Sequence, residues 1–334
     1  MKGSTIWVQA PARLHLGMLD LEGSLKRRFG GLGIAIEWPV VRVAVRPAPV
    51  LTVRGPCADR VRAVAERFWA AARSAGYPTP PGAAIEVHQV IPAHVGLGSG
   101  TQLHLAVVEA LARMIGWDLT VVELCRLAGR GRRSGVGTWT YLHGGLVLEG
   151  GRRTDDGTDA GLAPLLGRYA VPPAWRFVLV IPRGSRGIHG DAEEAAFAGQ
   201  VSMDAGTVGR LCRLVLLQLL PSLLEEDLLT FGRAVTEIQR IVGDVFAPVQ
   251  GGRYANPVSA ACVEALLELG AAGAGQSSWG PTVYGLAADE VHAERLAAAL
   301  RRRPGPDGRP LAEVATIEVV APNHQGRRIW TEDH

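Results

Sequence analysis

The stretch Pro92–Gln102, PAHVGLGSGTQ, comes directly before a long amphipathic segment and decides how the chain folds. Its glycines at 96, 98 and 100 allow positive φ angles and a close approach of a ligand to the backbone. A helix predicted over Ser99–Ile115 then directs the N–H groups and partial positive charge of its first turn at the same place. The stretch therefore predicts an anion site suited to phosphate or pyrophosphate.

The loop matches neither of the two common nucleotide-binding patterns. It lacks the G-K-[ST] ending of a Walker loop, and it does not follow a first strand with an acidic residue about 20 positions later, as a Rossmann loop does. The competing interpretation is a glycine-rich turn that binds nothing, in which Ser99 or Thr101 only caps the helix. The residues predicted to bind the anion are Gly96, Leu97, Gly98, Ser99, Gly100 and Thr101.

Composition indicates a globular protein of about two domains. The chain has 334 residues, 47% of them hydrophobic and 20% charged, and its net charge of +3 gives no case for nucleic-acid binding. Only Lys2 and Lys26 are lysines, so a Schiff-base mechanism would have essentially one candidate, Lys26. The sequence predicts an enzyme of small molecules rather than a nucleic-acid protein.

The four cysteines and the apolar segments predict a cytoplasmic protein. The cysteines are far apart and form no C-x-x-C pair, which favours buried thiols in a reducing compartment. The N-terminal segment has no apolar signal core. Leu214–Leu224 is judged too short to span a bilayer, and it contains Gln218 and Pro221.

Hydrophobic periodicity predicts strands mixed with helices in no regular βαβ rhythm, which is typical of the α+β class. A Gly-rich turn is expected before 145–148, and the Gly/Pro/Asp-rich segment 155–173 is expected to cross between domains. The predicted strands are 5–9, 40–45, 85–90, 145–148, 177–181, 282–287 and 314–320. The predicted helices are 58–75, 99–115, 121–128, 192–198, 205–220, 228–241, 260–269 and 290–301.

Three glycine-containing segments resemble the motifs of one known superfamily. Pro11–Asp20 (PARLHLGMLD), Pro92–Gln102 and Gly275–Thr282 (GQSSWGPT) resemble, in order and spacing, the three signature motifs of the GHMP kinase superfamily. The resemblance covers most of the chain. It implies a ribosomal S5 domain 2-like N-terminal domain over 1–165 and a ferredoxin-like C-terminal domain over 174–325. It also implies a site between them and a homodimer.

The segment Ser134–Gly145, SGVGTWTYLHGG, departs from the kinases of that superfamily. They carry S-G-x-D there, and the aspartate serves as the base for the acceptor hydroxyl. Gly137 takes its place, and glycine cannot deprotonate a hydroxyl, whereas a positioned base is typically worth about 10²- to 10⁴-fold in rate. Arg13 stands where some of these kinases have a lysine. A kinase with a shifted carboxylate remains the alternative.

The departures resemble one branch of the superfamily, the β-ribofuranosylaminobenzene 5'-phosphate synthases. The similar strings are RLHLGMLDL, GLGSGTQ, GRGRRSGVG, GIHGDAEEAAF and QSSWGPT. The resemblance implies magnesium-assisted condensation of phosphoribosyl pyrophosphate with 4-aminobenzoate in methanopterin biosynthesis, with release of carbon dioxide and pyrophosphate. Related C-nucleoside antibiotic synthases use a heteroaromatic acid, and that alternative stays open.

The same resemblance implies roles for particular residues. Asp20 and Arg27 match charged positions of the first segment, although a loop acid and a solvated Lys26–Arg28 run would explain them too. The implied catalytic residues are Asp20, Arg27 and His189, and the implied magnesium ligands are Asp20 and Ser99. Arg13, Arg132 and Arg133 would bind phosphate. The aromatic acid would lie among Gln250, Gln276, Ser277, Ser278 and Trp279, and packing alone would also explain Trp279.

Overall fold

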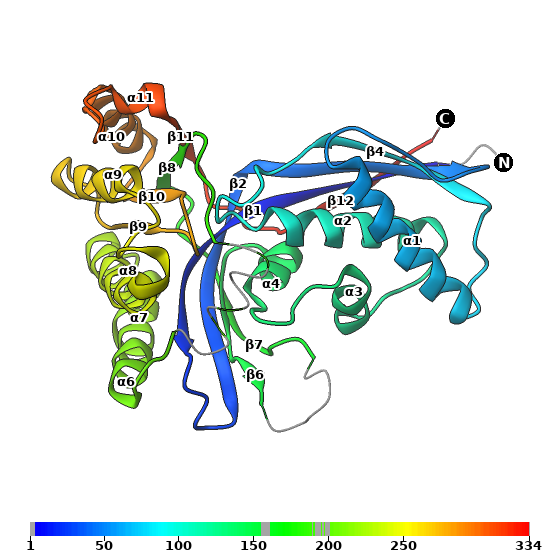
Figure 1. The fold of residues 1–334 in the computed structure, drawn as a ribbon, viewed down its shortest axis with the longest axis horizontal. Coiled ribbons are helices and arrows are strands. Elements are labelled where there is room, and N and C mark those ends of the chain that lie inside the picture. The colour runs from blue at the N-terminus through cyan, green and yellow to red at the C-terminus, as the bar shows by residue number, and fades with distance from the viewer. Residues whose placement is uncertain are drawn as a thin grey trace.

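A long bent hairpin forms the centre of the fold. The computed structural model describes residues 4–154, 161–188, 190, 195, 197 and 201–333. Strand β1 (Thr5–Asp20) pairs antiparallel with β2 (Arg27–Ala48), and the register shifts between Pro11 and Ala12 and again between His15 and Gly17. Such irregularities bend a strand pair. In Figure 1 the hairpin starts beside the N-terminus and runs down between the two halves of the molecule.

The hairpin belongs to an eight-stranded sheet with the order β12-β1-β2-β4-β3, in which β5 and β6 also pair with β2, and β7 pairs with β5. The last strand, β12, returns from the C-terminus to pair with β1. The other strands are β3 (Thr52–Arg54), β4 (Gly82–Gln89), β5 (Leu146–Glu149), β6 (Arg152–Arg153), β7 (Leu165–Tyr169) and β12 (Arg328–Glu332).

Helix α2 (Ser99–Met114) packs on this sheet and is buried at every residue from Gln102 to Ala112. This depth explains why its sequence is apolar on nearly all sides. The helices α1 (Ala58–Ser74), α3 (Val121–Ala128) and α4 (Val136–His143) contact α2 (Figure 1). The anion loop is therefore attached to a helix that is buried over most of its length.

The C-terminal half contains a four-stranded antiparallel sheet in the order β11-β8-β10-β9. Its strands are β8 (Arg176–Pro182), β9 (Ala274–Gln276), β10 (Val283–Ala287) and β11 (Ala315–Val320). A π-helical turn, Val215–Leu219, joins α6 to α7. The helices are α6 (Ala205–Leu214), α7 (Leu220–Leu224), α8 (Leu228–Gln250), α9 (Pro257–Glu268), α10 (Glu290–Arg302) and α11 (Leu311–Val314).

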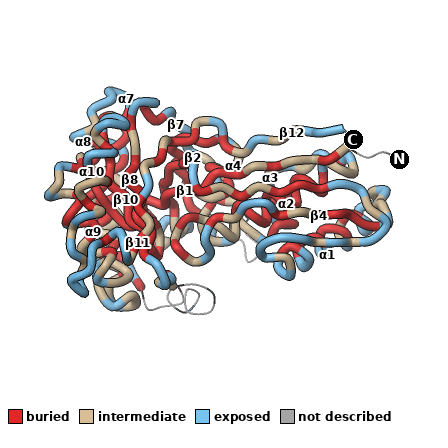
Figure 2. The backbone as a smooth tube through the Cα atoms, turned by 90° about the horizontal axis from the view of Figure 1, so that it is seen from above, coloured by how far each residue is buried: buried red, intermediate tan, exposed pale blue. Residues whose placement is uncertain are grey.

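One hydrophobic core runs across both halves. It includes Leu14 of β1, Leu105 of α2 and Ile238 of α8, all with no exposed surface. Figure 2 shows the buried backbone continuing through the junction. A second, smaller core lies between the four-stranded sheet and the helices α9 and α10. The two halves therefore pack against each other through a shared core.

Several sequence predictions needed correction. The strands predicted at 5–9 and 40–45 are only the outer ends of β1 and β2, because the glycines in the middle of the hairpin hide the strand pattern. The turn predicted before 145 contains helix α4, and the predicted crossing 155–173 contains strand β7. The helix predicted at 192–198 lies largely outside the described residues.

The segment Leu214–Leu224 belongs to a longer helical run than the sequence indicated. Within the described part of the chain, Ala205–Leu224 is one run of 20 residues, long and apolar enough by length and composition to cross a membrane. The length argument against a membrane span was therefore wrong. The same run packs against β1 and α8, as helices of globular domains do.

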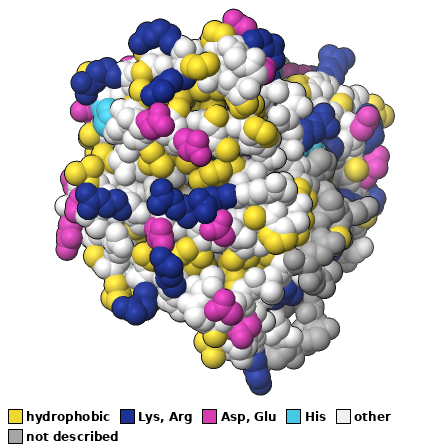
Figure 3. All heavy atoms as spheres, turned by 60° about the vertical axis from the view of Figure 1, so that its left-hand side comes forward, with side chains coloured by type: hydrophobic (Ala, Val, Ile, Leu, Met, Phe, Trp, Pro, Cys, Tyr) yellow, Lys and Arg dark blue, Asp and Glu magenta, His cyan; other side chains and the backbone are white. Residues whose placement is uncertain are grey.

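Charges are mixed on the face of the molecule shown in Figure 3, where arginines lie among acidic and apolar side chains. Ion pairs at the surface of the molecule include Arg253 with Asp244 and Arg210 with Glu237. Arginines on this face are accompanied by acidic side chains, so a cluster of arginines without acids would be a distinct feature of the molecule.

Candidate active site

The three motif segments, Pro11–Asp20, Pro92–Gln102 and Gly275–Thr282, meet at the junction of the two halves. The backbone N–H of His15 in β1 donates to the Ser277 hydroxyl (2.9 Å), which in turn donates to the Gly96 carbonyl (2.7 Å). The N–H of Arg13 donates to the Leu97 carbonyl at 3.2 Å, and that of Ser278 donates to the His15 carbonyl at 3.2 Å. Ser277 is fully buried and ties all three segments together.

The anion loop requires its glycines. Gly96 has φ +85°, and a Cβ atom there would lie 2.2 Å from the Ser277 carbonyl oxygen. Gly98 is the N-cap of α2 with φ +82°, and no side chain caps the helix. Because the first N–H groups of a helix have no partner within it, this uncapped terminus can receive a phosphate oxygen.

Arginines dominate the lining of a cleft of about 690 Å³ beside this loop. Among its described lining residues there is no aspartate or glutamate. A cleft lined by one sign of charge attracts and holds polyanions. The arginines that line it are Arg13, Arg130, Arg132, Arg133 and Arg152, and the histidines are His15 and His94.

The cleft contains part of the predicted phosphate-binding set. Gly96, Thr101, Arg13, Arg132 and Arg133 line it. Leu97, Gly98, Ser99 and Gly100 belong to the same loop and first turn, where Leu97 contributes its backbone while its side chain packs in the core. Sequence reasoning missed Arg130 and Arg152, because single arginines carry no signal of their own in a chain so rich in arginine.

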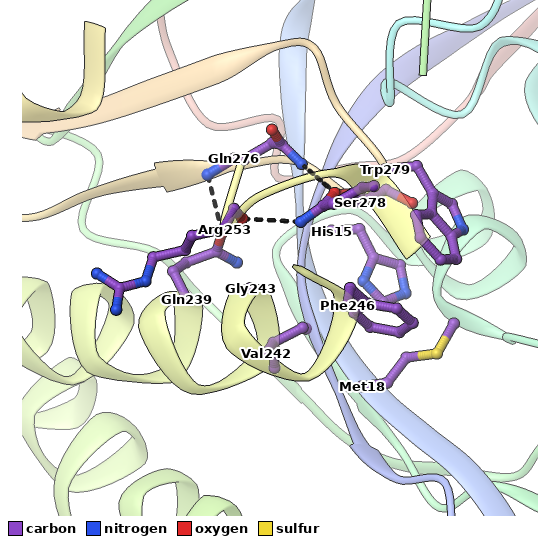
Figure 4. Close-up of a pocket in the computed structure, with 12 residues that line it drawn as sticks. His15, Met18, Gln239, Val242, Gly243, Phe246, Arg253, Gln276, Ser278 and Trp279 are labelled. Carbon is purple, nitrogen blue, oxygen red and sulfur yellow. Dashed lines mark hydrogen bonds between the residues drawn. The ribbon is translucent and has the colours of Figure 1, made fainter. Parts of the chain in front are cut away.

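A narrow apolar pocket opens from the same junction (Figure 4). Val242 and Phe246 of α8 line it together with Met18 and Trp279. The Trp279 ring packs edge-on against Phe246, with ring centroids 4.5 Å apart. The residues shared by the pocket and the arginine cleft are His15, Met18, Ser278 and Trp279.

The predicted aromatic-pocket residues come together here. Gln250, Gln276, Ser278 and Trp279 line the apolar pocket, while Ser277 lies behind it. The side-chain amide of Gln276 is already engaged, since its oxygen accepts from Ala255 N–H (2.7 Å) and its nitrogen donates to the Ser278 carbonyl (3.1 Å). Gln276 thus shapes the loop that carries Trp279.

His15 is uncharged at the meeting point of the two cavities. Burial, assisted by the nearby Arg13 guanidinium, lowers the pKa of His15 to about 3. Its Nε2 lies 3.3 Å from the hydroxyl of Ser134, another residue of the cleft. Ser134 also bonds to the buried carboxylate of Glu149. The junction therefore carries a neutral imidazole between the arginines and the apolar pocket.

Asp20 and Arg27 lie near the tip of the β1–β2 hairpin, and neither lines the cleft. The Asp20 carboxylate accepts the N–H groups of Glu22 (2.7 Å) and Gly23 (2.9 Å), and Arg27 donates to the Gly151 carbonyl at 3.0 Å. Lys26 is exposed in the same turn. His189 lies outside the described residues, so its role stays a prediction.

The magnesium site implied by the resemblance stays a prediction. No group of three or more histidine, cysteine or carboxylate side chains suited to a metal occurs among the described residues. Asp20 and Ser99, the two expected ligands, are both absent from the lining of the cleft. Mg²⁺ prefers carboxylate and phosphate oxygens, so an ion that arrives on a diphosphate belongs to the substrate.

Gly137, which stands in place of the aspartate of the S-G-x-D motif, lines the cleft at the first turn of α4. A Cβ atom on Gly137 would lie 3.1 Å from Cγ2 of Thr101, and the Gly137 carbonyl accepts from the Gln102 side chain at 2.9 Å. The position is thus closely packed without a side chain. Nothing in the described lining replaces the missing carboxylate.

The fold and site define a class of protein. Residues 59–141 match the GHMP kinases N terminal domain, and residues 219–307 match the GHMP kinases C terminal domain. A homoserine kinase from Cytophaga hutchinsonii superposes with a TM-score of 0.65 at 20% identity, covering 98% of this chain and 97% of that one. The Methanococcus jannaschii mevalonate kinase gives a TM-score of 0.67 at 12% identity, covering 95% and 98%. The chain has the two-domain GHMP kinase fold.

Curated relatives narrow the class. The beta-ribofuranosylphenol 5'-phosphate synthase of Archaeoglobus fulgidus is 34% identical over 292 residues, which cover 84% of this chain and 87% of that protein. Proteins of the same name from Methanothermobacter thermautotrophicus and Methanocaldococcus jannaschii are 31% and 27% identical, covering 83% and 97% of this chain and 87% and 99% of theirs. The chain belongs to this synthase family and is an enzyme of the C-riboside-forming type.

Proposed function

We propose that this enzyme joins C1 of phosphoribosyl pyrophosphate to a ring carbon of an aromatic acid and releases pyrophosphate and carbon dioxide. One observation carries the proposal. A cleft lined by five arginines and no described acid shares His15, Met18, Ser278 and Trp279 with a narrow apolar pocket. The arginines suit the two phosphate groups of the sugar, and the pocket suits a flat ring.

The reaction balances without a protein base. The bond from C1 to the pyrophosphate oxygen breaks, and the electron pair leaves with pyrophosphate. The ring carbon that bears the carboxylate attacks C1, and the bond to the carboxylate then breaks, so its electrons restore the aromatic ring as carbon dioxide departs. No proton needs to be removed, which is compatible with glycine at position 137. Positive charge at the departing diphosphate is the main requirement.

The acceptor we favour is 4-hydroxybenzoate, with 4-aminobenzoate as its competitor. A hydroxyl or amino group para to the carboxylate donates electrons to the attacking carbon, so either acid meets the chemical requirement. The relatives are named for a ribofuranosylphenol, whose ring carries a hydroxyl group. We further propose that magnesium enters on the diphosphate, and that the enzyme acts in the cytoplasm as a homodimer on small molecules, with no nucleic-acid or membrane partner.

Carboxyl-labelled acids test the proposal directly. The purified enzyme is incubated with phosphoribosyl pyrophosphate, Mg²⁺ and either labelled 4-hydroxybenzoate or labelled 4-aminobenzoate, and released carbon dioxide is counted. Release that needs phosphoribosyl pyrophosphate is expected, faster with the hydroxy acid. A parallel sample receives ATP and small alcohols. ADP formation there, with no decarboxylation in the first sample, would establish a kinase instead.

A further inference from the structure

Arg130 lies against the first turn of α2, and no sequence pattern singled it out. A Cβ atom built on Gly100 would be 3.0 Å from Nη2 of Arg130 and 3.5 Å from its Cζ. Arg130 also lines the arginine cleft. Its guanidinium therefore sits beside the uncapped N-terminus of a 16-residue helix, where two sources of positive potential add together.

A buried histidine holds this guanidinium in place. Nδ1 of His104, on α2, is 3.0 Å from the Ala128 carbonyl oxygen, and because a carbonyl only accepts, Nδ1 carries the proton. Nη2 of Arg130 is 3.1 Å from Nδ1 and 3.2 Å from Nε2 of the same ring. Nearly equal distances to both nitrogens place the guanidinium over the ring rather than along one lone pair.

The His104 ring must be uncharged for this contact to be attractive. Burial is the main cause that lowers its pKa to about 3, and the charge of Arg130 adds to the effect, so the ring is neutral from pH 5 upward. A neutral aromatic face attracts a guanidinium, whereas an imidazolium would repel it. The ring thus fixes one arginine on the side of α2 that faces the cleft.

We propose that Arg130 is a binding residue for the pyrophosphate half of the substrate and that His104 is the positioning residue that presents it. The inference rests on the proposed function, because it assigns one part of the same cleft. It separates the two anion subsites: Arg130 and the α2 terminus would hold the diphosphate, leaving the 5'-phosphate to other arginines of the cleft.

The first test measures binding of inorganic pyrophosphate and of ribose 5-phosphate by calorimetry. Arg130→Ala should weaken pyrophosphate binding at least about 10-fold, the loss expected for a charge-assisted hydrogen bond, and leave ribose 5-phosphate unchanged. If the parent enzyme binds neither ligand, the proposed function fails. If the parent binds pyrophosphate and Arg130→Ala binds it equally well, only the present inference fails.

Two substitutions of His104 separate positioning from support of the loop. His104→Asn keeps a donor for the Ala128 carbonyl but removes the ring, whereas His104→Phe keeps the ring face and removes the donor. Positioning of Arg130 predicts weaker pyrophosphate binding and a raised KM for phosphoribosyl pyrophosphate in the Asn variant, with nearly parental values in the Phe variant. The opposite ranking would overturn the positioning role.

Gly100→Ala provides an independent test with opposite effects on fold and binding. Alanine favours a helix interior over glycine by about 1 kcal/mol, yet its Cβ would push the Arg130 guanidinium aside. We expect an unchanged or higher Tm with pyrophosphate affinity reduced several-fold, and no further loss when Gly100→Ala is added to Arg130→Ala. Gly209→Ala, a helical glycine with nothing within 4 Å, is the matched control. Additive losses in the double variant would show that the new methyl group blocks the ligand itself.

Discussion

Glu149 gives the sharpest prediction about pH. It is the last residue of β5 and has no exposed surface. Its carboxylate accepts from the N–H of Gly151 (2.7 Å) and of Gly135 (3.3 Å), and it also bonds to the Ser134 hydroxyl. Burial outweighs these bonds and raises the pKa of Glu149 from 4.5 to about 7.

The sign of the effect follows from the direction of this change. A carboxyl group with a raised pKa in the folded state binds its proton more tightly there than in the unfolded chain. Its contribution to stability is therefore complete below pH 4.5 and is lost as the pH rises through 7. At about 1.4 kcal/mol for each pH unit, the rise from 4.5 to about 7 corresponds to roughly 3 kcal/mol.

Glu149→Gln keeps the shape of the protonated side chain and cannot ionise. The Gln amide has one acceptor oxygen for the N–H groups of Gly135 and Gly151, so the variant loses one of the bonds at every pH. Relative to the parent, its free energy of unfolding should therefore rise by up to roughly 3 kcal/mol between pH 5 and pH 8.5. Urea unfolding followed by tryptophan fluorescence measures it at both pH values. The control Glu66→Gln removes a charge from the exposed face of α1 and should give a curve parallel to the parent. A parallel curve for Glu149→Gln as well would refute the reasoning.

Three further changes test other parts of the site. Gly96→Ala should lower the free energy of unfolding by at least about 2 kcal/mol, because it combines an unfavourable φ with a close contact to the Ser277 carbonyl. The control Gly76→Ala has a similar φ with nothing within 4 Å, so its loss in free energy of unfolding, measured by thermal unfolding, should be about half as large. Gly137→Asp should weaken pyrophosphate binding at least about 10-fold by calorimetry, since it puts a negative charge into the cleft, and a gain of ADP formation would contradict this. Trp279→Leu should raise the KM for the aromatic acid about 10-fold in steady-state kinetics and leave pyrophosphate affinity unchanged. An unchanged KM would show that the aromatic acid does not bind against the Trp279 ring.

The sequence predicted those parts of the site that are encoded locally. The glycine loop, the helix after it and the Gln276–Trp279 segment were identified because glycine spacing and helical periodicity are written in consecutive residues. The GHMP fold followed from the order of three such segments, and the family matches confirm it. The length of the central hairpin was missed, since its strands are held by backbone pairing across glycines rather than by an alternating apolar pattern.

The remaining features depend on contacts between distant residues. Arg130 became distinctive only because His104, 26 positions earlier, lies under its guanidinium. Glu149 reads as an ordinary acid at a strand end, yet the fold buries it completely behind Ser134. Conversely, Asp20 and Arg27 stood out by resemblance, and the structure places them at the hairpin, outside the cleft lining. Their catalytic role stays a prediction from the family.

The positions of the charged and neutral side chains at the junction support the proposed reaction more strongly than the number of arginines does. In the proposed reaction, departure of pyrophosphate leaves positive charge on the sugar, so a cation would be useful beside the diphosphate and harmful beside C1. The fold provides this separation: five arginines line the phosphate cleft, while His15, where the cleft meets the apolar pocket, is held neutral by burial and by Arg13. Met18 and Trp279 complete that meeting point without adding charge. A kinase reaction would need a carboxylate at position 137 to remove a proton. A ring carbon that loses carbon dioxide does not, so glycine at position 137 is sufficient for the proposed reaction.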